Sequence, residues 1–489
     1  TPANSFWNDF PALNSYIARV QSFMQQGRSD NDILLYFPVF DRYADPGRGM
    51  LEHFDAISPA FRGSPFAKAA DTLPKMGYAY DYVSDLQISK SAVEKNLIKT
   101  EGNTYSTLLL PGCKYLPLET FEKILKMAEE GAIILLYESL PENVSGFADY
   151  LKKNEVFNRL KASLAFKTAA EHVMKAGYGK GKILMGDNIG ELLSFAGIRR
   201  EAMADKGIMF NRRKLPDGTV YFIKNISQNT FQGWLPASEL PASSDKLPAS
   251  SDAGYAAVYN PSTGRSGSTP ARKTDNGSAE IFLRINPQET FILKTSASGQ
   301  KADRYPFYDA SAAPEEIQGR WSLEFTEGGP AIPQARNIEK LSSWTETGGD
   351  EVRNFSGTAS YKTTFRKPAG KADAYKIDLG KVCNSARIIL NGEETGILIG
   401  PDFSVTVDKK KIKKNNTLEV RVSNLMANRI AWMDRNKIEW KKFYNVNFSA
   451  RLRENNKNGI FDASGWAPRE SGLIGPVTVT RMKEEKTTE

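Results

Sequence analysis

The apolar positions in the first part of the chain switch repeatedly between helical and strand spacing. An aromatic-rich stripe recurs at every third or fourth residue and stops at Gly27, which predicts an amphipathic helix over Phe6–Gly27. An unbroken apolar run of strand length lies at 33–39, and further strand-like segments lie at 78–84, 106–111, 132–138 and 182–187. Helical segments alternate with these strands. Strands that alternate with helices predict a doubly wound parallel sheet over about 30–197.

The hydrophobic period changes to two after Gly207. Asp217-Gly218 lies between two alternating runs and predicts a hairpin, and 280–295 predicts a second hairpin. Between them, 235–253 holds three near-copies of the phrase LPAS with no aromatic residue, which we interpret as a loop insertion. From Trp321 onward, short strands with Asn391-Gly392 between two of them predict an antiparallel sandwich that closes on a strand at 477–479.

Length and composition are those of a soluble protein with several domains. The 489 residues are 40% apolar and 25% charged, and this length suggests about three domains. No apolar run reaches the ~18 residues of a membrane helix, so no membrane span is expected. The first residues carry no basic segment followed by an apolar one. Either a signal peptide has been removed or the chain is an internal piece of a longer one.

Charge and cysteine content exclude several classes of partner. The net charge of +8 is spread along the chain, and its densest cluster is KKKIKK at 409–414. This run leads into a strand, so we interpret it as a solvated hairpin loop and expect no nucleic-acid partner. Cys113 and Cys383 form neither a disulfide framework nor a metal-binding spacing. No cofactor is expected, although a structural Ca²⁺ held by backbone carbonyls would leave no trace in the sequence.

Several of these segments resemble known glycoside hydrolases. DLGKV at 378–382, ARIILNGEETG at 386–396, NTLEVRVSN at 416–424 and the closing SGLIGPVTV resemble the sugar-binding jelly roll of glycoside hydrolase family 2. With NLMANRIAW at 424–432 they resemble the C-terminal end of the family 106 α-L-rhamnosidases. DILLYFPVFDRY, MGYAYDYVSD, STLLLPGCKYLP and EEGAIILLYE are similar to the amidotransferase-like domain, flavodoxin-like in fold, that follows the catalytic barrel of such enzymes.

The resemblance implies a multidomain α/β plus β chain with four parts. These are a remnant of the last catalytic-barrel helix at 1–28, an amidotransferase-like α/β domain at 29–200, a β-sandwich with the LPAS-rich insertion at 201–300, and a galactose-binding-like jelly roll at 301–489. The acid and base carboxylates of such enzymes lie on a (β/α)₈ barrel, and no eight-fold strand–helix series is present here. We therefore assign no catalytic residue in this chain.

Two functions follow from these observations. The first is an accessory C-terminal region of an α-L-rhamnosidase-like hydrolase, joined to an upstream catalytic barrel and acting on a plant or microbial, rhamnose-containing glycan. Such a protein is expected to be bacterial and secreted, periplasmic or on the cell surface. The alternative is a stand-alone carbohydrate-binding or adhesion protein without catalysis. The sequence alone gives neither the glycan and its linkage nor the oligomeric state.

Cys113 suggests a third chemistry, because it follows a buried strand where class I amidotransferases place their nucleophile. That chemistry needs small residues on both sides, a base, and a carboxylate that orients the base. Lys114 follows where a glycine is expected, and the histidines of the chain are His53 and His172. Glu171 and His172 fall on a predicted helix, where adjacent side chains point about 100° apart. We interpret Cys113 as a buried apolar thiol.

Two regions hold candidates for ligand contact. The Asp41–Gly49 loop and the segment with Tyr82 and Asp85 follow strands at the sheet edge where α/β proteins bind ligands, although a solvated loop is the simpler interpretation. In the last domain, amide and guanidinium groups suit vicinal hydroxyls and indole rings suit a pyranose face. The candidate carbohydrate-binding residues there are Asn424, Asn428, Arg429, Trp432 and Trp466. In the structural alternative, asparagines cap turns and the arginine packs on tryptophans.

The helix at Phe6–Gly27 resembles the last barrel helix and carries a larger aromatic stripe than the edge of one sheet needs. In this chain we expect it to lie on the α/β domain with part of that face exposed. We also expect that deleting Thr1–Arg28 improves solubility and costs little thermal stability.

Overall fold

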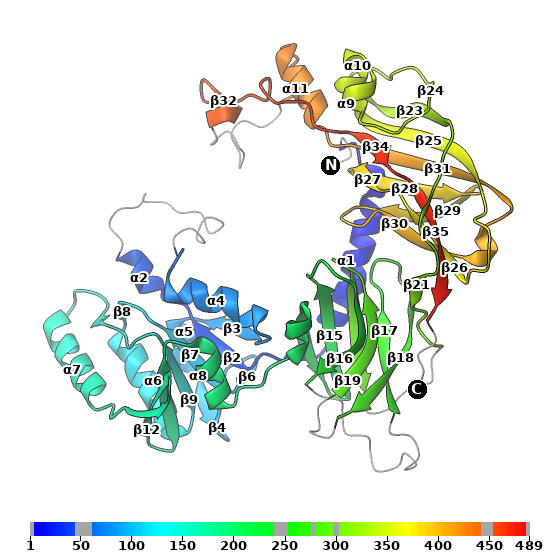
Figure 1. The fold of residues 1–489 in the computed structure, drawn as a ribbon. Helices are drawn as coiled ribbons and strands as arrows, with labels where there is room; N and C mark the ends of the chain where they lie inside the picture. Colours follow the sequence, from blue (N-terminus) through cyan, green and yellow to red (C-terminus); the bar gives the residue numbers. More distant parts are fainter. Residues whose placement is uncertain are drawn as a thin grey trace. The chain divides into compact units, whose positions relative to one another are not determined.

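The structure is a computed structural model that describes residues 4–44, 61–238, 253–274, 279–296, 303–441 and 453–485 (Figure 1). The chain divides into two compact units: one is Val20–Tyr305, and the other combines Thr1–Arg19 with Pro306–Glu489. Among the helices in the described ranges, none has the length and apolar content that crossing a membrane requires. The finer four-part division stays a prediction.

A seven-stranded sheet lies at the centre of the α/β part of Val20–Tyr305. Its parallel strands lie in the order β3-β2-β7-β9-β13, and β11 and β12 extend it as an antiparallel edge (Figure 1). Their bounds are β2 (Ile33–Tyr36), β3 (Tyr80–Val83), β7 (Thr107–Pro111), β9 (Ile133–Tyr137), β11 (Lys167–Ala170), β12 (Val173–Tyr178) and β13 (Gly181–Gly186). All the strand runs predicted for the parallel sheet are therefore present.

Helices cover both faces of this sheet because the buried strands are apolar on both sides. Ile33 and Leu35 of β2 belong to one core cluster, which holds residues of α4 (Pro65–Lys75) and α8 (Ile189–Ala196). Leu34 and Tyr36 belong to the other, with residues of α5 (Asp85–Lys90), α6 (Leu118–Glu130) and α7 (Tyr150–Ala162). This arrangement explains why β2 reads as an unbroken apolar run.

Local sequence signals mark the ends of two of these helices. The Oγ atom of Ser64 accepts the N–H of Ala67, and Pro65 occupies the first turn of α4. Helix α6 ends at Gly131, whose φ of 122° a residue with a side chain rarely adopts.

The helix predicted at Glu171 and His172 is wrong. These residues form the turn between β11 and β12. The preceding alanines favour a helix, but β12 pairs with β13 from Met174 to Tyr178 and buries Val173 and Ala176. Tertiary pairing therefore overrides local propensity at this edge.

Val20–Tyr305 also contains an eight-stranded antiparallel sheet, in the order β1-β14-β15-β20-β17-β18-β19-β16. The strands are β1 (Arg28–Ser29), β14 (Ile208–Leu215), β15 (Gly218–Asn225), β16 (Phe231–Ala237), β17 (Ala253–Tyr259), β18 (Ser266–Lys273), β19 (Ala279–Ile285) and β20 (Thr290–Ser296). The predicted hairpin around Asp217-Gly218 is confirmed by the pairing of β14 with β15. Most of the LPAS-rich segment, 239–252, lies outside the described residues.

The hairpin predicted at 280–295 is wrong, because β17 and β18 lie between β19 and β20 in the sheet. Both strands exist where the alternation predicts them, and both are largely buried. Alternation identifies a strand and its buried face, but it does not determine which strands pair with that strand.

Residues Pro306–Glu489 form two antiparallel sheets around a shared core. One contains β21 (Tyr308–Ala310), β22 (Glu315–Glu316), β26 (Ala374–Asp378), β30 (Ser404–Asp408) and β35 (Thr478–Glu484). The other has the order β24-β23-β25-β31-β28-β29, with bounds β23 (Trp321–Gly329), β24 (Arg336–Ile338), β25 (Ser356–Arg366), β28 (Ser385–Leu390), β29 (Glu393–Leu398) and β31 (Asn415–Ser423). The predicted turn Asn391-Gly392 joins β28 to β29, and both residues have positive φ, at 54° and 88°.

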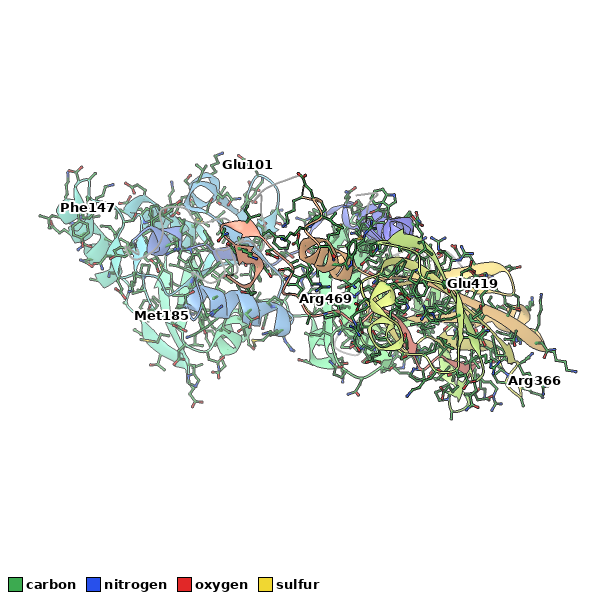
Figure 2. The ribbon with its side chains drawn as sticks, turned by 90° about the horizontal axis from the view of Figure 1, so that it is seen from above. Glu101, Phe147, Met185, Arg366, Glu419 and Arg469 are labelled. Carbon is green, nitrogen blue, oxygen red and sulfur yellow. The ribbon has the colours of Figure 1, made fainter. Side chains whose placement is uncertain are left out.

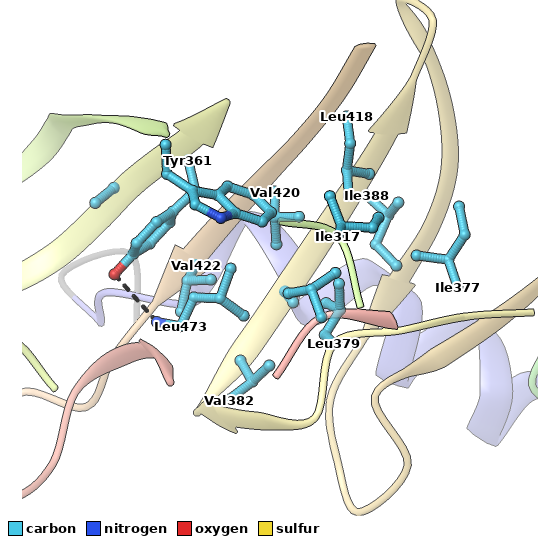
Figure 3. Close-up of a cluster of buried hydrophobic side chains, with 14 of the residues drawn as sticks. Ile317, Tyr361, Ile377, Leu379, Val382, Ile388, Leu418, Val420, Val422 and Leu473 are labelled. Atoms are coloured by element: carbon cyan, nitrogen blue, oxygen red, sulfur yellow. Dashed lines mark hydrogen bonds between the residues drawn. The ribbon is translucent and has the colours of Figure 1, made fainter. Parts of the chain in front are cut away.

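Side chains from both sheets pack together in one core (Figure 3). Ile377 comes from one sheet and Ile388 and Val420 from the other, and Leu473 of β34 (Gly472–Gly475) lies with them. The N–H of Leu473 donates to the Tyr361 hydroxyl at 3.1 Å, so the closing segment is held to β25. The lysines of the 409–414 run are exposed between β30 and β31, as the loop interpretation expects.

The N-terminal helix α1 (Phe10–Met24) follows the short turn η1 (Trp7–Asp9). The buried Asp9 accepts a hydrogen bond from Ser385 Oγ at 2.7 Å and pairs with Arg387 at 3.1 Å, both on β28. At the other end of the helix, Phe23 and Met24 pack against Leu215, Val220 and Ile292 of the eight-stranded sheet.

The expectation that this helix lies on the α/β domain is therefore wrong. Deleting Thr1–Arg28 would remove Arg28 of strand β1 and the contacts of Asp9, Phe23 and Met24, so we now expect a larger loss of thermal stability than the sequence suggested. One part of the expectation fits the structure: α1 buries no residue completely, and Trp7 and Ile17 are 43% and 41% exposed.

Candidate functional site

Asn424 follows the last residue of β31 and is a structural residue. It is 1% exposed. Its Oδ1 accepts the N–H of Gly357 at 2.9 Å, and its Nδ2 donates to the Phe355 carbonyl and to Ser471 Oγ, each at 2.9 Å. The amide therefore ties the exit of β31 to the start of β25 and to the closing segment.

Asn428, on α11 (Ala427–Arg435), plays a similar part. It is 4% exposed, its Oδ1 accepts the N–H of Arg469 at 2.8 Å, and its Nδ2 donates to the Arg469 carbonyl at 2.8 Å. The polar atoms of Asn424 and Asn428 are buried and bonded within the fold, which favours the structural alternative, and sugar contact by these two residues stays a prediction. A ligand that displaced these bonds would have to offset the free-energy cost of breaking them.

Arg429, the next residue of α11, has unused hydrogen-bonding capacity. Its guanidinium lies against Gly329, where an added Cβ would come within 2.6 Å of Cζ. Its Nε is buried and has no hydrogen-bond partner among the described residues. Buried donors are normally bonded, so Arg429 remains a candidate for ligand contact.

The two candidate tryptophans differ in their surroundings, although both are half-buried. Trp466 donates from Nε1 to Asn455 at 2.7 Å, and its ring meets Phe461 edge-on with 5.7 Å between centroids. Trp432 lies on α11, next to Ala431 in the chain.

Sequence analysis missed the group that organises the loops around Trp466. Asp434 accepts the indole N–H of Trp440 at 2.7 Å and the backbone N–H of Ala463 at 2.8 Å, and it pairs with Lys441 at 3.1 Å. Trp440 in turn meets Phe461 edge-on. These residues lie in loops and a helix end, where no periodic signal marks them.

Cys113, at the end of β7, is buried and 5% exposed. Burial, with the carboxylates of Asp41 and Asp85 nearby, raises the pKa of this thiol well above its usual value. A nucleophilic cysteine needs the opposite shift. His172 pairs instead with Asp187 at 3.0 Å, and His53 lies outside the described residues. The structure therefore favours the inert buried thiol.

Alkylation tests this interpretation. In a Cys383→Ser background, which leaves one thiol, we expect iodoacetamide to label native Cys113 slowly at neutral pH. Labelling should become fast only when urea unfolds the chain, because the thiolate then becomes both accessible and more populated. Fast labelling of the native protein at pH 7 would instead restore the amidotransferase hypothesis.

The other polar candidates at the sheet edge are engaged within the fold. Asp41 accepts the backbone N–H groups of Lys114 and Tyr115, at 3.0 and 2.8 Å. Burial raises the pKa of the Asp41 carboxyl, although these N–H groups act to lower it. Asp85 accepts the hydroxyls of Tyr36 and Thr120, at 3.0 and 2.7 Å. Tyr82 is 53% exposed, and the rest of the Asp41–Gly49 loop from position 45 lies outside the described residues.

A polar groove of 590 Å³ lies over the six-stranded sheet, and sequence analysis missed it. We call it the sheet groove. Its lining residues are Asn8, Asp9, Glu324, Thr326, Glu327, Thr358, Ser360, Lys362, Arg387, Glu419, Arg421 and Ser423. Glu419, labelled in Figure 2, accepts hydrogen bonds from Ser360 at 3.0 Å and Arg421 at 2.7 Å. Partial burial would raise the pKa of Glu419, but these bonds outweigh it and hold that pKa below its usual value.

The sequence contains only part of the information needed to predict this groove. Thr358, Ser360 and Lys362 alternate with apolar residues, as do Glu419 and Arg421. Such alternation predicts one polar face on each strand, but the groove requires knowing that β23, β25, β31 and β28 are neighbours. In the described part of the chain, no three His, Cys, Asp or Glu side chains are grouped so that they could hold a metal ion.

Comparison with known proteins gives three findings. Residues 3–233 match the family model of the glycoside hydrolase family 106 α-L-rhamnosidases. A putative β-glucuronidase of Formosa agariphila is 35% identical over 120 residues, which are 24% of this chain and 10% of that protein. The solved rhamnosidase of Novosphingobium sp. PP1Y is 20% identical with a TM-score of 0.66, over 98% of this chain and 41% of that one.

The family match confirms the resemblance to family 106 over residues 3–233, and the solved rhamnosidase shows a similarity of fold. The chain spans less than half of that rhamnosidase and a tenth of the glucuronidase-like protein.

Proposed function

We propose that this chain is the non-catalytic C-terminal region of an α-L-rhamnosidase-like glycoside hydrolase that acts on rhamnose-containing glycans. One observation carries the proposal. The fold matches a solved rhamnosidase over 98% of this chain but only 41% of that longer protein, while residues 3–233 match the rhamnosidase family. The remainder of the polypeptide would supply the reacting groups.

The strand topology supports the view that the catalytic carboxylates lie elsewhere. Glycosidases of this general type use two carboxyl groups that face the scissile bond. The resemblance places these groups on a (β/α)₈ barrel, and such a barrel needs eight parallel strands. Among the described residues, five parallel strands instead form one open series with an antiparallel edge, and one further parallel pair of two-residue strands lies outside it. We propose an upstream barrel as the partner of α1, whose aromatic stripe is only partly covered here.

We also propose names for the parts. With the parallel strands numbered along the chain, their order in the sheet is 2-1-3-4-5, which is the flavodoxin-like order and suits an amidotransferase-like domain. The eight-stranded sheet corresponds to the β-sandwich, and the two antiparallel sheets of Pro306–Glu489 correspond to a galactose-binding-like jelly roll. Within it, Arg429, Trp432 and Trp466 are the proposed glycan contacts, on a scaffold held by Asn424 and Asn428.

The alternative function is a stand-alone carbohydrate-binding or adhesion protein. The reading frame upstream of Thr1 discriminates between the two. A frame that continues for about 500 residues with barrel periodicity supports the accessory region of a hydrolase. A start codon and signal peptide directly before Thr1 would instead support the stand-alone protein. We propose a bacterial secreted, periplasmic or cell-surface location in both cases.

A further inference from the structure

The sheet groove is built from rows of side chains that cross neighbouring strands. Glu324 of β23 is in register with Ser360 of β25, which is in register with Arg421 of β31 and then Arg387 of β28. At a strand spacing of about 4.8 Å, a row over four strands is roughly 14 Å long. The groove volume of 590 Å³ is within the usual range of ligand sites.

A second row runs parallel to the first, and η1 lies along it. It contains Glu327, Thr358, Ser423 and Ser385 in register. Asp9 accepts the hydroxyl of Ser385, and the Asn8 side chain donates to Glu327 at 3.2 Å. The second row is therefore bridged from β28 to β23, and the Glu324–Ser360–Arg421 row is the open part of the groove.

The charges of the groove are nearly balanced, which disfavours an anionic ligand. Its lining holds four carboxylates and three cationic side chains. Arg387 pairs with Asp9 and with Glu394, at 3.1 and 2.6 Å. Glu419 lies 2.7 Å from Arg421 and 3.8 Å from Lys362. Each cation of the groove thus already faces a carboxylate of this chain.

The lining also disfavours a protein partner. Protein interfaces usually have an apolar and aromatic centre. Every described residue that lines the groove is polar, and Thr326, Thr358, Ser360 and Ser423 add hydroxyl groups. Hydroxyls, carboxylates and guanidinium groups together offer donors and acceptors at short intervals. That pattern matches a chain of sugar hydroxyls.

We infer that the sheet groove binds a neutral glycan chain, which lies along the Glu324–Ser360–Arg421 row and ends against Asn8 and Asp9. The carboxylate of Glu324 accepts from sugar hydroxyls, and the terminal nitrogens of Arg421 donate to them. The inference rests on the proposed function, because it supplies a second contact with the glycan besides Arg429, Trp432 and Trp466. It also specifies that the bound stretch is uncharged.

Calorimetric titration of the full chain tests this inference with two probes. One is an uncharged oligosaccharide of α-linked rhamnose, and the other alternates rhamnose with a uronic acid. We expect the uncharged probe to bind and the uronic-acid probe to bind no more tightly. Glu324→Ala and Arg421→Met should each weaken binding about tenfold, as expected for the loss of hydrogen bonds to a charged group.

The matched controls are Glu339→Ala and Arg366→Met, at exposed residues of the same unit outside the groove. They should leave affinity within about twofold of the unmodified chain. Glu324 is exposed and makes no ion pair among the described residues, so Glu324→Ala should also keep the melting temperature.

Three results would overturn the inference. The first is binding of the uncharged probe that Glu324→Ala and Arg421→Met leave unchanged, which would move the glycan elsewhere and leave the proposed function intact. The second is clearly tighter binding of the uronic-acid probe, and the third is no binding of either. A separate assay, hydrolysis of an aryl α-L-rhamnoside by this chain, tests whether the chain is non-catalytic.

Discussion

Replacing Arg212 with methionine should lower the free energy of unfolding of Val20–Tyr305 by about 3–5 kcal/mol, because it leaves a buried carboxylate without a countercharge. The Arg212 side chain is 2% exposed, lies 2.8 Å from Asp32, and forms an ion pair with Glu201, which is 0% exposed. Glu201 also accepts the Tyr221 hydroxyl at 3.2 Å and the N–H of Ser238 at 2.8 Å. These neutral donors would remain, but they do not neutralise the charge.

The effect should be specific to the buried network. Arg265→Met, at an exposed arginine of the same unit, should change the unfolding free energy by less than about 0.5 kcal/mol. Adding Glu201→Gln to Arg212→Met should recover part of the loss, since the unpaired charge is then absent. Urea denaturation with hydrogen exchange localised to β14 and β15 measures each value. A loss below about 1 kcal/mol for Arg212→Met would show that this pairing is not what holds the two sheets of the unit together.

Replacing Trp344 with alanine should destabilise Pro306–Glu489 by about 3–5 kcal/mol, the usual cost of removing a large buried aromatic side chain. Trp344 is 0% exposed. Its indole N–H donates to the Tyr361 hydroxyl at 2.6 Å, and its ring packs edge-on against Phe325 and Phe355, with centroids 5.4 and 5.6 Å away. The substitution therefore opens a cavity and breaks a buried hydrogen bond together.

One variant separates the cavity from the hydrogen bond, and a second variant serves as a control. Trp344→Phe keeps much of the ring volume but loses the bond to Tyr361, so it should cost less than Trp344→Ala. Trp7→Ala removes a tryptophan that is 43% exposed and should cost less than about 1 kcal/mol. Chemical denaturation followed by near-ultraviolet circular dichroism measures the differences. Equal losses for Trp7→Ala and Trp344→Ala would contradict this assignment of the core.

The sequence predicted the positions of the strands more reliably than it predicted which strands pair. The runs around Ile33 and Leu108 are apolar without interruption, and both became parallel strands covered on two sides. The hairpin at 280–295 failed because the partners of β19 and β20 are set by the closure of the whole sheet. The helix at His172 failed because pairing with β13 outweighed the propensity of nearby alanines.

The site was harder to predict than the fold, because side chains of one chemical type serve both structure and recognition. The amides of Asn424 and Asn428 suit a sugar, yet both are buried and hold strand exits together. The sheet groove depends on the cross-strand register of residues far apart in sequence, such as Glu324 and Arg421. No local sequence pattern predicts which residues of different strands lie opposite one another.

Hydrolysis of an aryl α-L-rhamnoside by the isolated chain is the most direct measurement of the central claim. We expect no release of the aryl group above that of a heat-unfolded sample of the same chain, because we propose that the acid and base carboxylates lie outside it. The proposal that this region is non-catalytic would be contradicted by turnover at a rate comparable with complete family 106 enzymes.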